Sequence, residues 1–107
     1  MYRIYFLERQ FDFDRVMDTA AKHPWIGYDT EFIGEKTFTP VLCLMQVITG
    51  DAIYLIDTLR INDLTRFLEI LEDPEVLKIT HAGDNDYRLL NTLYKTVPQN
   101  TFDTQIA

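Results

Sequence analysis

The chain has 107 residues, which is room for one domain. Hydrophobic residues make up 47% of it, so the composition supports a packed core and excludes a disordered chain. With 17 acidic and 10 basic side chains the formal net charge is -7, which argues against a surface that binds phosphate backbones through a basic patch.

The sequence shows no sign of membrane insertion or secretion. No apolar run is long enough to span a bilayer, and the residues from Met1 to Arg3 do not open a signal peptide. The single cysteine, Cys43, lies in an apolar run and cannot form an internal disulfide. We therefore expect a cytoplasmic protein without membrane contacts, in which Cys43 is a buried structural thiol.

The first elements are a short strand and an amphipathic helix. Residues 2–7 alternate weakly and predict a leading strand. Asp12 or Asp14 opens the helix, and Pro24 closes it. The apolar stripe of this helix has the spacing of one helix face and consists of Phe13, Val16, Met17 and Ala20.

Residues 25–32 predict the central strand, because they are rich in aromatic and β-branched residues and are followed by a turn signal. Side chains alternate between the faces of a strand, so Asp29 and Glu31 share one face, and Tyr28, Thr30 and Phe32 share the other. Two neighbouring carboxylates repel each other, and a divalent cation between them would turn this repulsion into attraction. For the pair alone, the favoured explanation is simply a polar strand end that emerges into water.

A polar loop, a hairpin and a second helix follow. The run 41–49 is almost continuously apolar, as expected for a strand buried on both faces. A turn at residues 50–51 leads into its hairpin partner, residues 53–56. The second helix is capped by Asn62 or Asp63 and ends near Pro74, and its apolar stripe consists of Leu64, Phe67, Leu68 and Leu71.

Residues 76–80 predict a strand that runs through a tight turn into a helix ending near Tyr94, with Asp84 as the N-cap. Counting back by three and four from Leu89 and Leu90 places Asp86 on the core-facing stripe of the first turn. The helix dipole also favours an acid in the first turn, but it does not require the inward face. Asp86 is therefore a candidate functional residue.

The last residues, 101–107, predict a short strand or turn in which Asp103 caps a following helix. The complete order of elements suits an α/β fold with a mixed sheet.

If residues 25–32 and 76–80 are parallel neighbours, Asp29, Glu31 and Asp86 meet at the carboxyl edge of the sheet. An oxygen-only cluster suits Mg²⁺ or Mn²⁺ rather than zinc. Two such ions, about 4 Å apart, support phosphodiester hydrolysis and offset part of the negative charge.

Three motifs in this order resemble the first part of the ribonuclease D type of 3′-5′ exonuclease. They are Asp29-Thr30-Glu31-Phe32, His81-Ala82-Gly83 followed by Asp86, and Phe102-Asp103-Thr104-Gln105-Ile106-Ala107. The resemblance runs from about Trp25 to the last residue, and it places the chain in the DEDD group, whose fold is a ribonuclease H-like mixed β-sheet flanked by helices.

The resemblance also implies roles for the acids. Asp29 would bridge two metal ions, Glu31 would hold the ion that activates water, and Asp86 would hold the second ion. Asp103 does not occupy the position of the last ligand in the family's pattern, and we interpret it as a helix cap.

The family's third motif, a tyrosine followed four residues later by the fourth metal-binding aspartate, lies beyond the last residue given. Tyr87 and Tyr94 lie on the wrong helix to replace this tyrosine. We therefore expect residues 1–107 to be the N-terminal portion of a single exonuclease domain whose fold and site are incomplete at the C-terminus. Alone, it should be inactive or weakly active, and it should form a homodimer through the surface left uncovered.

The resemblance predicts a metal-dependent 3′-5′ exonuclease that acts on the 3′ ends of single-stranded RNA or DNA. The alternative is a non-catalytic module of the same fold that binds nucleic acid or assembles with partners. The acids favour the enzyme, whereas the missing third motif and the negative charge favour the module.

Four further residues are weaker candidates for substrate contacts. Thr30 and Lys36 could reach phosphates, and Phe32 could stack on the terminal base or belong to the core. His81 ends a strand beside the site, where it contacts substrate or makes a structural hydrogen bond. Gln46, inside an apolar strand, is expected to satisfy a backbone group.

Overall fold

The computed structural model describes residues 2–34, 40–81 and 83–104, and for residues 83–86 it describes the course of the helix without the side chains. The described chain forms nine elements, which are β1 (Arg3–Leu7), α1 (Gln10–Ala20), β2 (Trp25–Ile33), β3 (Val41–Ile48), β4 (Ala52–Ile56), α2 (Thr65–Glu72), β5 (Leu77–Thr80), α3 (Gly83–Tyr94) and β6 (Thr101–Asp103). This is the predicted α/β order, with the final segment forming a strand.

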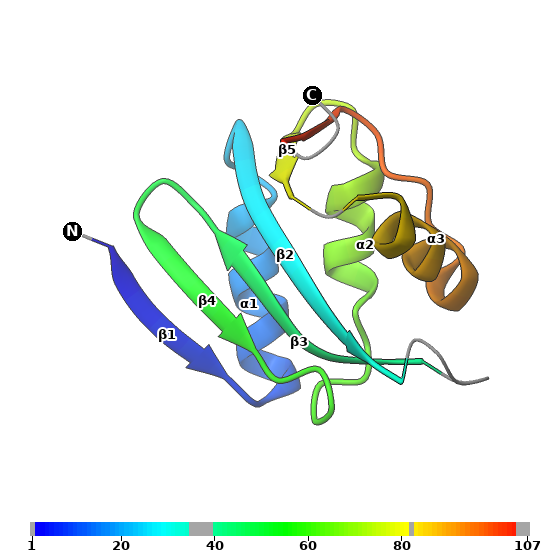
Figure 1. Cartoon of the computed structure of the whole chain (residues 1–107). Coiled ribbons are helices and arrows are strands. Elements are labelled where there is room, and N and C mark those ends of the chain that lie inside the picture. The colour runs from blue at the N-terminus through cyan, green and yellow to red at the C-terminus, as the bar shows by residue number, and fades with distance from the viewer. Residues whose placement is uncertain (1, 35–39, 82, 105–107) are drawn as a thin grey trace.

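The strands form one mixed sheet in the order β1-β4-β3-β2-β5-β6 (Figure 1). β3 pairs antiparallel with both β2 and β4, which confirms the predicted hairpin. β5 runs parallel to both β2 and β6, and β1 runs parallel to β4. The parallel neighbourhood of β2 and β5, on which the predicted site depends, is therefore confirmed.

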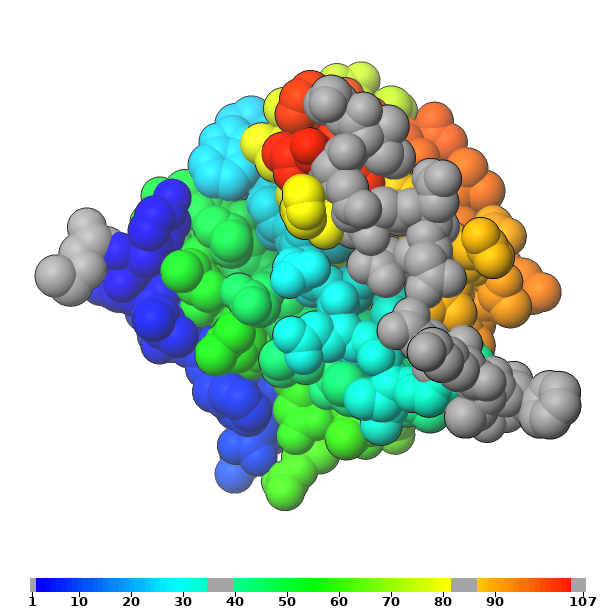
Figure 2. All heavy atoms as spheres, in the orientation of Figure 1, coloured from blue at the N-terminus to red at the C-terminus, as the bar shows by residue number. Residues whose placement is uncertain are grey.

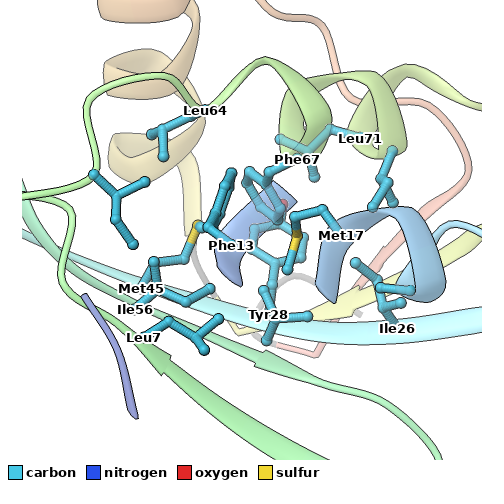
Figure 3. Close-up of a cluster of buried hydrophobic side chains, with 14 of the residues drawn as sticks. Leu7, Phe13, Met17, Ile26, Tyr28, Met45, Ile56, Leu64, Phe67 and Leu71 are labelled. Atoms are coloured by element: carbon cyan, nitrogen blue, oxygen red, sulfur yellow. The ribbon is translucent and has the colours of Figure 1, made fainter. Parts of the chain in front are cut away.

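One hydrophobic core lies between the sheet and the helices (Figure 3). Ile26 and Tyr28 of β2 point into it, where they meet Phe13 and Met17 of α1 and Phe67 of α2. These side chains are at most 3% exposed. Burial of each aliphatic or phenylalanine side chain contributes about 1.5–3 kcal/mol, so this packing holds the amino half of β2 in place.

The expectation that residues 41–49 are buried on both faces was wrong. Leu42, Met45 and Val47 are buried, but the alternate side chains of β3 are only partly covered, and Val41 is exposed. Cys43 belongs to this partly covered set, and its thiol donates a hydrogen bond to the carbonyl of Glu31 at 3.2 Å. The cause is that the described helices bury one face of the sheet into the core and leave side chains of the other face accessible.

Helix boundaries agree with the sequence to within a few residues. α1 begins at Gln10, before either predicted cap, and its side-chain amide donates to Asp14 Oδ1 at 3.0 Å. Asp63 lies two residues before α2 and accepts a hydrogen bond from the Thr65 amide at 3.0 Å, whereas the N-cap position itself is Leu64. α3 begins at Gly83, one residue before the predicted cap Asp84, whose side chain lies outside the described residues.

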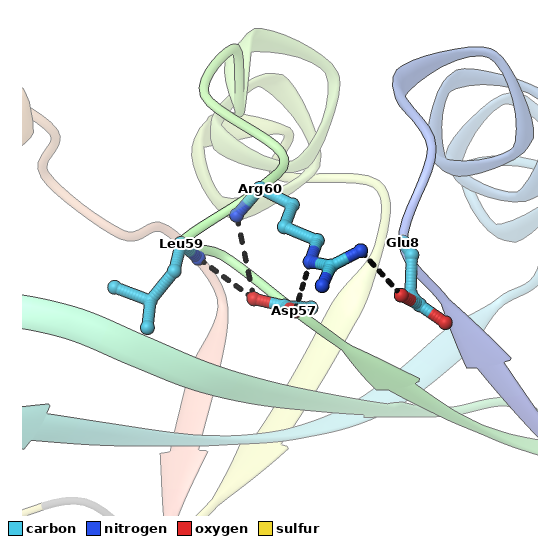
Figure 4. Close-up of polar contacts among 4 residues, drawn as sticks. All are labelled: Glu8, Asp57, Leu59 and Arg60. Carbon is cyan, nitrogen blue, oxygen red and sulfur yellow. Dashed lines mark hydrogen bonds and ion pairs between the residues drawn. The ribbon is translucent and has the colours of Figure 1, made fainter.

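A polar loop closes the β1–β4 end of the sheet (Figure 4). The Asp57 carboxylate accepts hydrogen bonds from the amides of Leu59 and Arg60 at 3.0 and 3.3 Å. Arg60 also pairs with Glu8 at 3.0 Å, and both side chains are largely exposed. Exposed pairs of this kind contribute little free energy, so the loop is held mainly by its backbone hydrogen bonds.

None of the described helices is long and apolar enough to cross a membrane.

Candidate active site

The candidate site lies where β2 and β5 separate. Their last paired residues are Tyr28 and Thr80, and β5 ends there, whereas β2 continues to Ile33. Beyond Tyr28, the one strand among the described residues that pairs with β2 is its antiparallel neighbour β3. A crevice at the carboxyl ends of parallel strands is where open α/β sheets place their ligands.

Asp29 and Glu31 occupy this carboxyl half of β2. Both are exposed, whereas Tyr28 and Thr30 between and before them are buried, so the two faces of the strand are assigned as predicted. Atoms of β2 reach the surface in the middle of the face seen in Figure 2. The two carboxylates therefore project from one rigid strand into solvent, close together and accessible to a cation.

Backbone contacts hold both acids. The amide of Thr30 donates a hydrogen bond to Asp29 Oδ1 at 3.0 Å, which fixes the orientation of that carboxylate. The carbonyl of Glu31 accepts a hydrogen bond from the Cys43 thiol. The register between β2 and β3 shifts directly after Glu31. Such irregularities re-aim side chains and are frequent beside active sites.

A hollow of about 400 Å³ adjoins Asp29. Its lining includes Trp25, Gly27, Gln46, His81 and Thr104. Nδ1 of His81 lies 2.8 Å from Oγ1 of Thr104, so His81 makes a structural hydrogen bond, which was one of the two roles expected from the sequence. Its exposed ring also borders the hollow.

The sequence did not indicate that Gln46 lies beside the candidate site. Gln46 stands directly opposite Asp29 in the β2–β3 register and lines the same hollow, and its side-chain amide makes no hydrogen bond to a backbone group of the described residues. Residues opposite each other in an antiparallel pair share a face. The apolar run around Gln46 hid this position, because only the strand register shows which residue faces Asp29.

Asp86 lies in the first turn of α3, which begins three residues after β5 ends. This confirms the predicted strand and helix, while Ala82 and the Asp86 side chain lie outside the described residues. Among the side chains that the structure describes, no three His, Cys, Asp or Glu residues form a metal-binding group. The described part of the site is therefore the Asp29–Glu31 pair.

The weaker candidates take different positions. Thr30 is 6% exposed and its hydroxyl points into the core, so the placement does not support a phosphate contact through this group. Phe32 is partly buried and packs against the core, as the alternative interpretation expected. Lys36 lies outside the described residues.

A second, larger hollow of about 520 Å³ lies between α3 and β6 and includes neither Asp29 nor Glu31. Tyr87 and Asp103 form part of its wall. Asp103 is only 8% exposed and lies at the end of β6, where the sequence predicted a strand or turn and a capping role. Burial, together with the neighbouring Tyr28 and a hydrogen bond to Asp103, raises the pKa of Tyr87. The sequence carried no signal for this buried polar contact.

Carboxylate pairs are the ligands that hard divalent cations such as Mg²⁺ and Mn²⁺ prefer. Asp29 and Glu31 fit such an ion in chemistry and exposure, and alternation along β2 places them on one face of the strand. Gln46 and His81 border the same hollow and offer polar groups to a bound molecule.

The family model of 3′-5′ exonucleases matches residues 4–107. Ribonuclease D of Serratia proteamaculans is 40% identical over 92 residues, which are 86% of this chain and 25% of that protein. Ribonuclease D of Escherichia coli K12 is 40% identical over 89 residues, or 83% of this chain and 24% of that protein.

Solved structures agree with these sequence matches. The crystal structure of Escherichia coli RNase D superimposes on 99% of this chain and 28% of its own, with a TM-score of 0.83 and 32% identity. The catalytic core of RRP6 from Trypanosoma brucei gives a TM-score of 0.87 over 97% of this chain and 29% of its own, and at 21% identity it supports the fold alone. The chain thus spans about a quarter of the length of the ribonuclease D relatives.

Proposed function

Since this chain belongs to the 3′-5′ exonuclease family, we propose that β2 and α3 carry metal-binding carboxylates of an exonuclease that shortens RNA from its 3′ end. The observation that carries the proposal is the position of Asp29 and Glu31. They stand side by side on the accessible face of β2, at the point where its parallel neighbour β5 ends. β5 leads directly into the helix that contains Asp86.

In this proposal Asp29, Glu31 and Asp86 hold two divalent cations, Mg²⁺ or Mn²⁺. When bound, such ions activate a water and neutralise charge on the reacting phosphate. Asp29 is suited to a bridging position, because the Thr30 amide already orients one of its oxygens. Glu31 is held through its own backbone by the Cys43 thiol. Ligands on a strand with fixed backbone contacts are preorganised, which favours a defined ligand geometry.

RNA is the favoured substrate. The ribonuclease D relatives share 40% identity with this chain, and the Escherichia coli RNase D is described as an exoribonuclease involved in structured RNA processing. Trypanosoma brucei RNase D has been crystallised with RNA U12. The chain's own charge of -7 repels RNA, so bound divalent cations also serve to make the site accessible to phosphates. The cytoplasmic location and the homodimer stay predictions.

Calorimetric titration with Mn²⁺ tests the metal site. The unmodified chain should bind Mn²⁺ with a dissociation constant of about 10⁻³ M, the range of weak oxygen sites. Asp29→Ala should weaken binding by about tenfold or more, because it removes the proposed bridging ligand. Glu75→Ala is the matched control, since it removes the same charge from an exposed position before β5 and should leave binding unchanged.

The same proteins are then incubated with a 5′-labelled single-stranded RNA and with the DNA of identical sequence. Shortening from the 3′ end by residues 1–107 should be weak, should require Mn²⁺, should be faster for RNA, and should be lost in Asp29→Ala but not in Glu75→Ala. Equal Mn²⁺ binding by the unmodified chain and Asp29→Ala would contradict the proposed site.

A further inference from the structure

β1 is an edge strand with little protection against further pairing (Figure 1). Among the described strands it pairs with β4 alone, through five consecutive residue pairs without a bulge. Its sequence, RIYFL, contains no proline and one charged residue, Arg3. Sheet edges present unpaired backbone amides and carbonyls, and proteins usually guard them with charges, prolines or bulges. The outer edge of β1 can therefore accept another strand.

Apolar side chains are exposed on both faces of β1. The ring of Tyr5 stacks on Tyr54 of β4, with centroids 5.5 Å apart, on the face of the sheet that α1 covers. Ile4 and Phe6 point to the opposite face, because side chains alternate along a strand. Tyr5, Ile4 and Phe6 are 42%, 67% and 57% exposed. Exposed apolar surface of this kind marks a site of protein–protein contact.

A hollow of about 430 Å³ lies between β1 and α1. Tyr5 and Leu7 line it from β1, and Asp12 and Arg15 are among the residues that line it from α1. The guanidinium of Arg15 lies over the ring of Phe11, 5.6 Å from its centroid. A strand added to the edge of β1 would cover the hollow from the side, and a pocket beside an edge strand is a common feature of sites that bind extended segments.

The strand that fits this edge best is β1 of a second copy. Tyr5 is the midpoint of Arg3–Leu7, so an antiparallel pairing with Tyr5 opposite Tyr5 joins the two strands over their full length. In this register Ile4 of each copy lies opposite Phe6 of the other. Aromatic and β-branched side chains that face each other across strands stabilise a sheet. The exposed side chains of β1 are thus complementary to those of a second β1.

Opposite charges meet at both ends of the same pairing. Arg3 shares a face with Tyr5 and lies opposite Leu7 of the other copy. Leu7 borders the hollow together with Asp12, so Arg3 of each copy comes close to Asp12 of the other. Neither Arg3 nor Asp12 forms a salt bridge with another described residue. The pairing supplies a counter-charge to both, whereas the net charge of -7 would otherwise drive two copies apart.

We propose that this chain forms a two-fold dimer in which the β1 strands of two copies pair antiparallel and join the two sheets into one. Tyr5, Ile4 and Phe6 form the centre of the interface, and an ion pair between Arg3 and Asp12 closes each end. Two-fold dimers are the commonest homo-oligomers. β1 lies at the opposite edge of the sheet from β5 and β6, so the dimer leaves the candidate active site open and needs neither metal nor substrate.

Sedimentation equilibrium over a range of concentrations tests the dimer with Phe6→Lys and Phe102→Lys. Phe102 is 51% exposed on β6, the opposite edge strand, so Phe102→Lys makes the same change of size and charge outside the interface. The unmodified chain should dimerise. Phe6→Lys should raise the dissociation constant by about tenfold or more, because it removes a buried aromatic contact twice and places a charge on each edge, and Phe102→Lys should leave it unchanged. If Phe6→Lys does not fold, Ile4→Lys takes its place.

Arg3→Glu and Asp12→Arg test the register. In either variant alone, like charges face each other at both ends of the interface, so each should dimerise about tenfold more weakly than the unmodified chain. In an equal mixture, the introduced glutamate of one variant meets the introduced arginine of the other, and the unchanged Arg3 meets the unchanged Asp12. The mixture should therefore dimerise about as tightly as the unmodified chain. Circular dichroism establishes that each variant is folded, and both positions are exposed.

Three results would overturn the proposal. The first is an unmodified chain that stays monomeric at the highest concentration reached. The second is a dimer that Phe6→Lys and Phe102→Lys weaken equally or leave equally intact, because the interface would then lie elsewhere. The third is a mixture of Arg3→Glu and Asp12→Arg that dimerises no better than the separate variants, because the strands would then not pair in this register.

Discussion

The two halves of β2 belong to one continuous strand but have different surroundings. Ile26 and Tyr28 are buried in the core against α1 and α2, and Gly27 and Tyr28 pair with both β3 and β5. Asp29 and Glu31, on the same strand, pair with β3 alone among the described strands and are exposed. The change occurs within one residue, at the pair Tyr28–Thr80.

This difference shows how one strand supports both stability and chemistry. The half that pairs on both sides anchors the strand in the core, so the direction of its continuation beyond β5 is fixed. The half that pairs with β3 offers two carboxylates that the fold does not need for packing. We expect substitutions in the first half to affect the free energy of unfolding, and those in the second half to affect metal binding.

The largest effect should come from Ile26→Ala. Ile26 is 0% exposed, and truncation of a buried isoleucine to alanine lowers the free energy of unfolding by about 3 kcal/mol through lost burial and a residual cavity. Asp29→Ala, three residues further on, should change it by less than about 1 kcal/mol, because the side chain is exposed. Urea denaturation of both variants measures the contrast. A loss above about 2 kcal/mol in Asp29→Ala would erase the distinction between the two halves.

Two buried threonines should respond in opposite directions to the same substitution. The Thr30 hydroxyl is buried and has no hydrogen-bond partner among the described residues, so Thr30→Val should stabilise the chain by about 1 kcal/mol. The Thr80 hydroxyl donates to the Tyr28 carbonyl at 2.8 Å, so Thr80→Val should destabilise it by about 1 kcal/mol. Chemical denaturation of Thr30→Val and Thr80→Val measures the two changes in unfolding free energy. Changes of the same sign would contradict the difference between the two hydroxyls.

The smallest effect concerns pH and Lys78, which lies in β5 beside the amino half of β2. Burial lowers the pKa of its ammonium group, and the charge of Asp73 partly offsets this shift. Nζ donates to the Asp73 carbonyl at 2.5 Å. Because the folded-state pKa lies below the unfolded value of about 10.4, the unfolded chain binds more protons at pH values between the two. This contribution to stability therefore rises with pH in that window.

The measurement is the difference in unfolding free energy between the unmodified chain and Lys78→Met, followed from about pH 8 to about pH 10. Taking this difference cancels the opposite effect of the buried tyrosines, whose pKa values are raised and whose contribution falls as pH increases. The unmodified chain should gain stability relative to Lys78→Met as the pH rises. A constant difference would mean that Lys78 is solvated in the folded protein.

The sequence by itself determined the elements and the faces of β2. Alternation along residues 25–32 was sufficient to separate Asp29 and Glu31 from Tyr28 and Thr30, because side-chain alternation is a property of every strand. Helical spacing located α1, α2 and α3 and placed Asp86 in the first turn of α3 for the same reason. These properties depend on neighbours within a few residues, and local periodicity therefore predicts them.

Only the tertiary structure decided where the strands separate and which polar groups are buried. The register that pairs Tyr28 with Thr80 and Gln46 with Asp29 joins residues far apart in the chain, and nothing in the local pattern specifies it. Asp103 was interpreted from its neighbours as a cap for residues that lie outside the described part of the chain, and the structure shows in addition that it is buried at the end of β6, against a helix that begins twenty residues earlier. Whether a polar side chain is exposed or buried depends on what packs against it, and that is a property of the assembled fold.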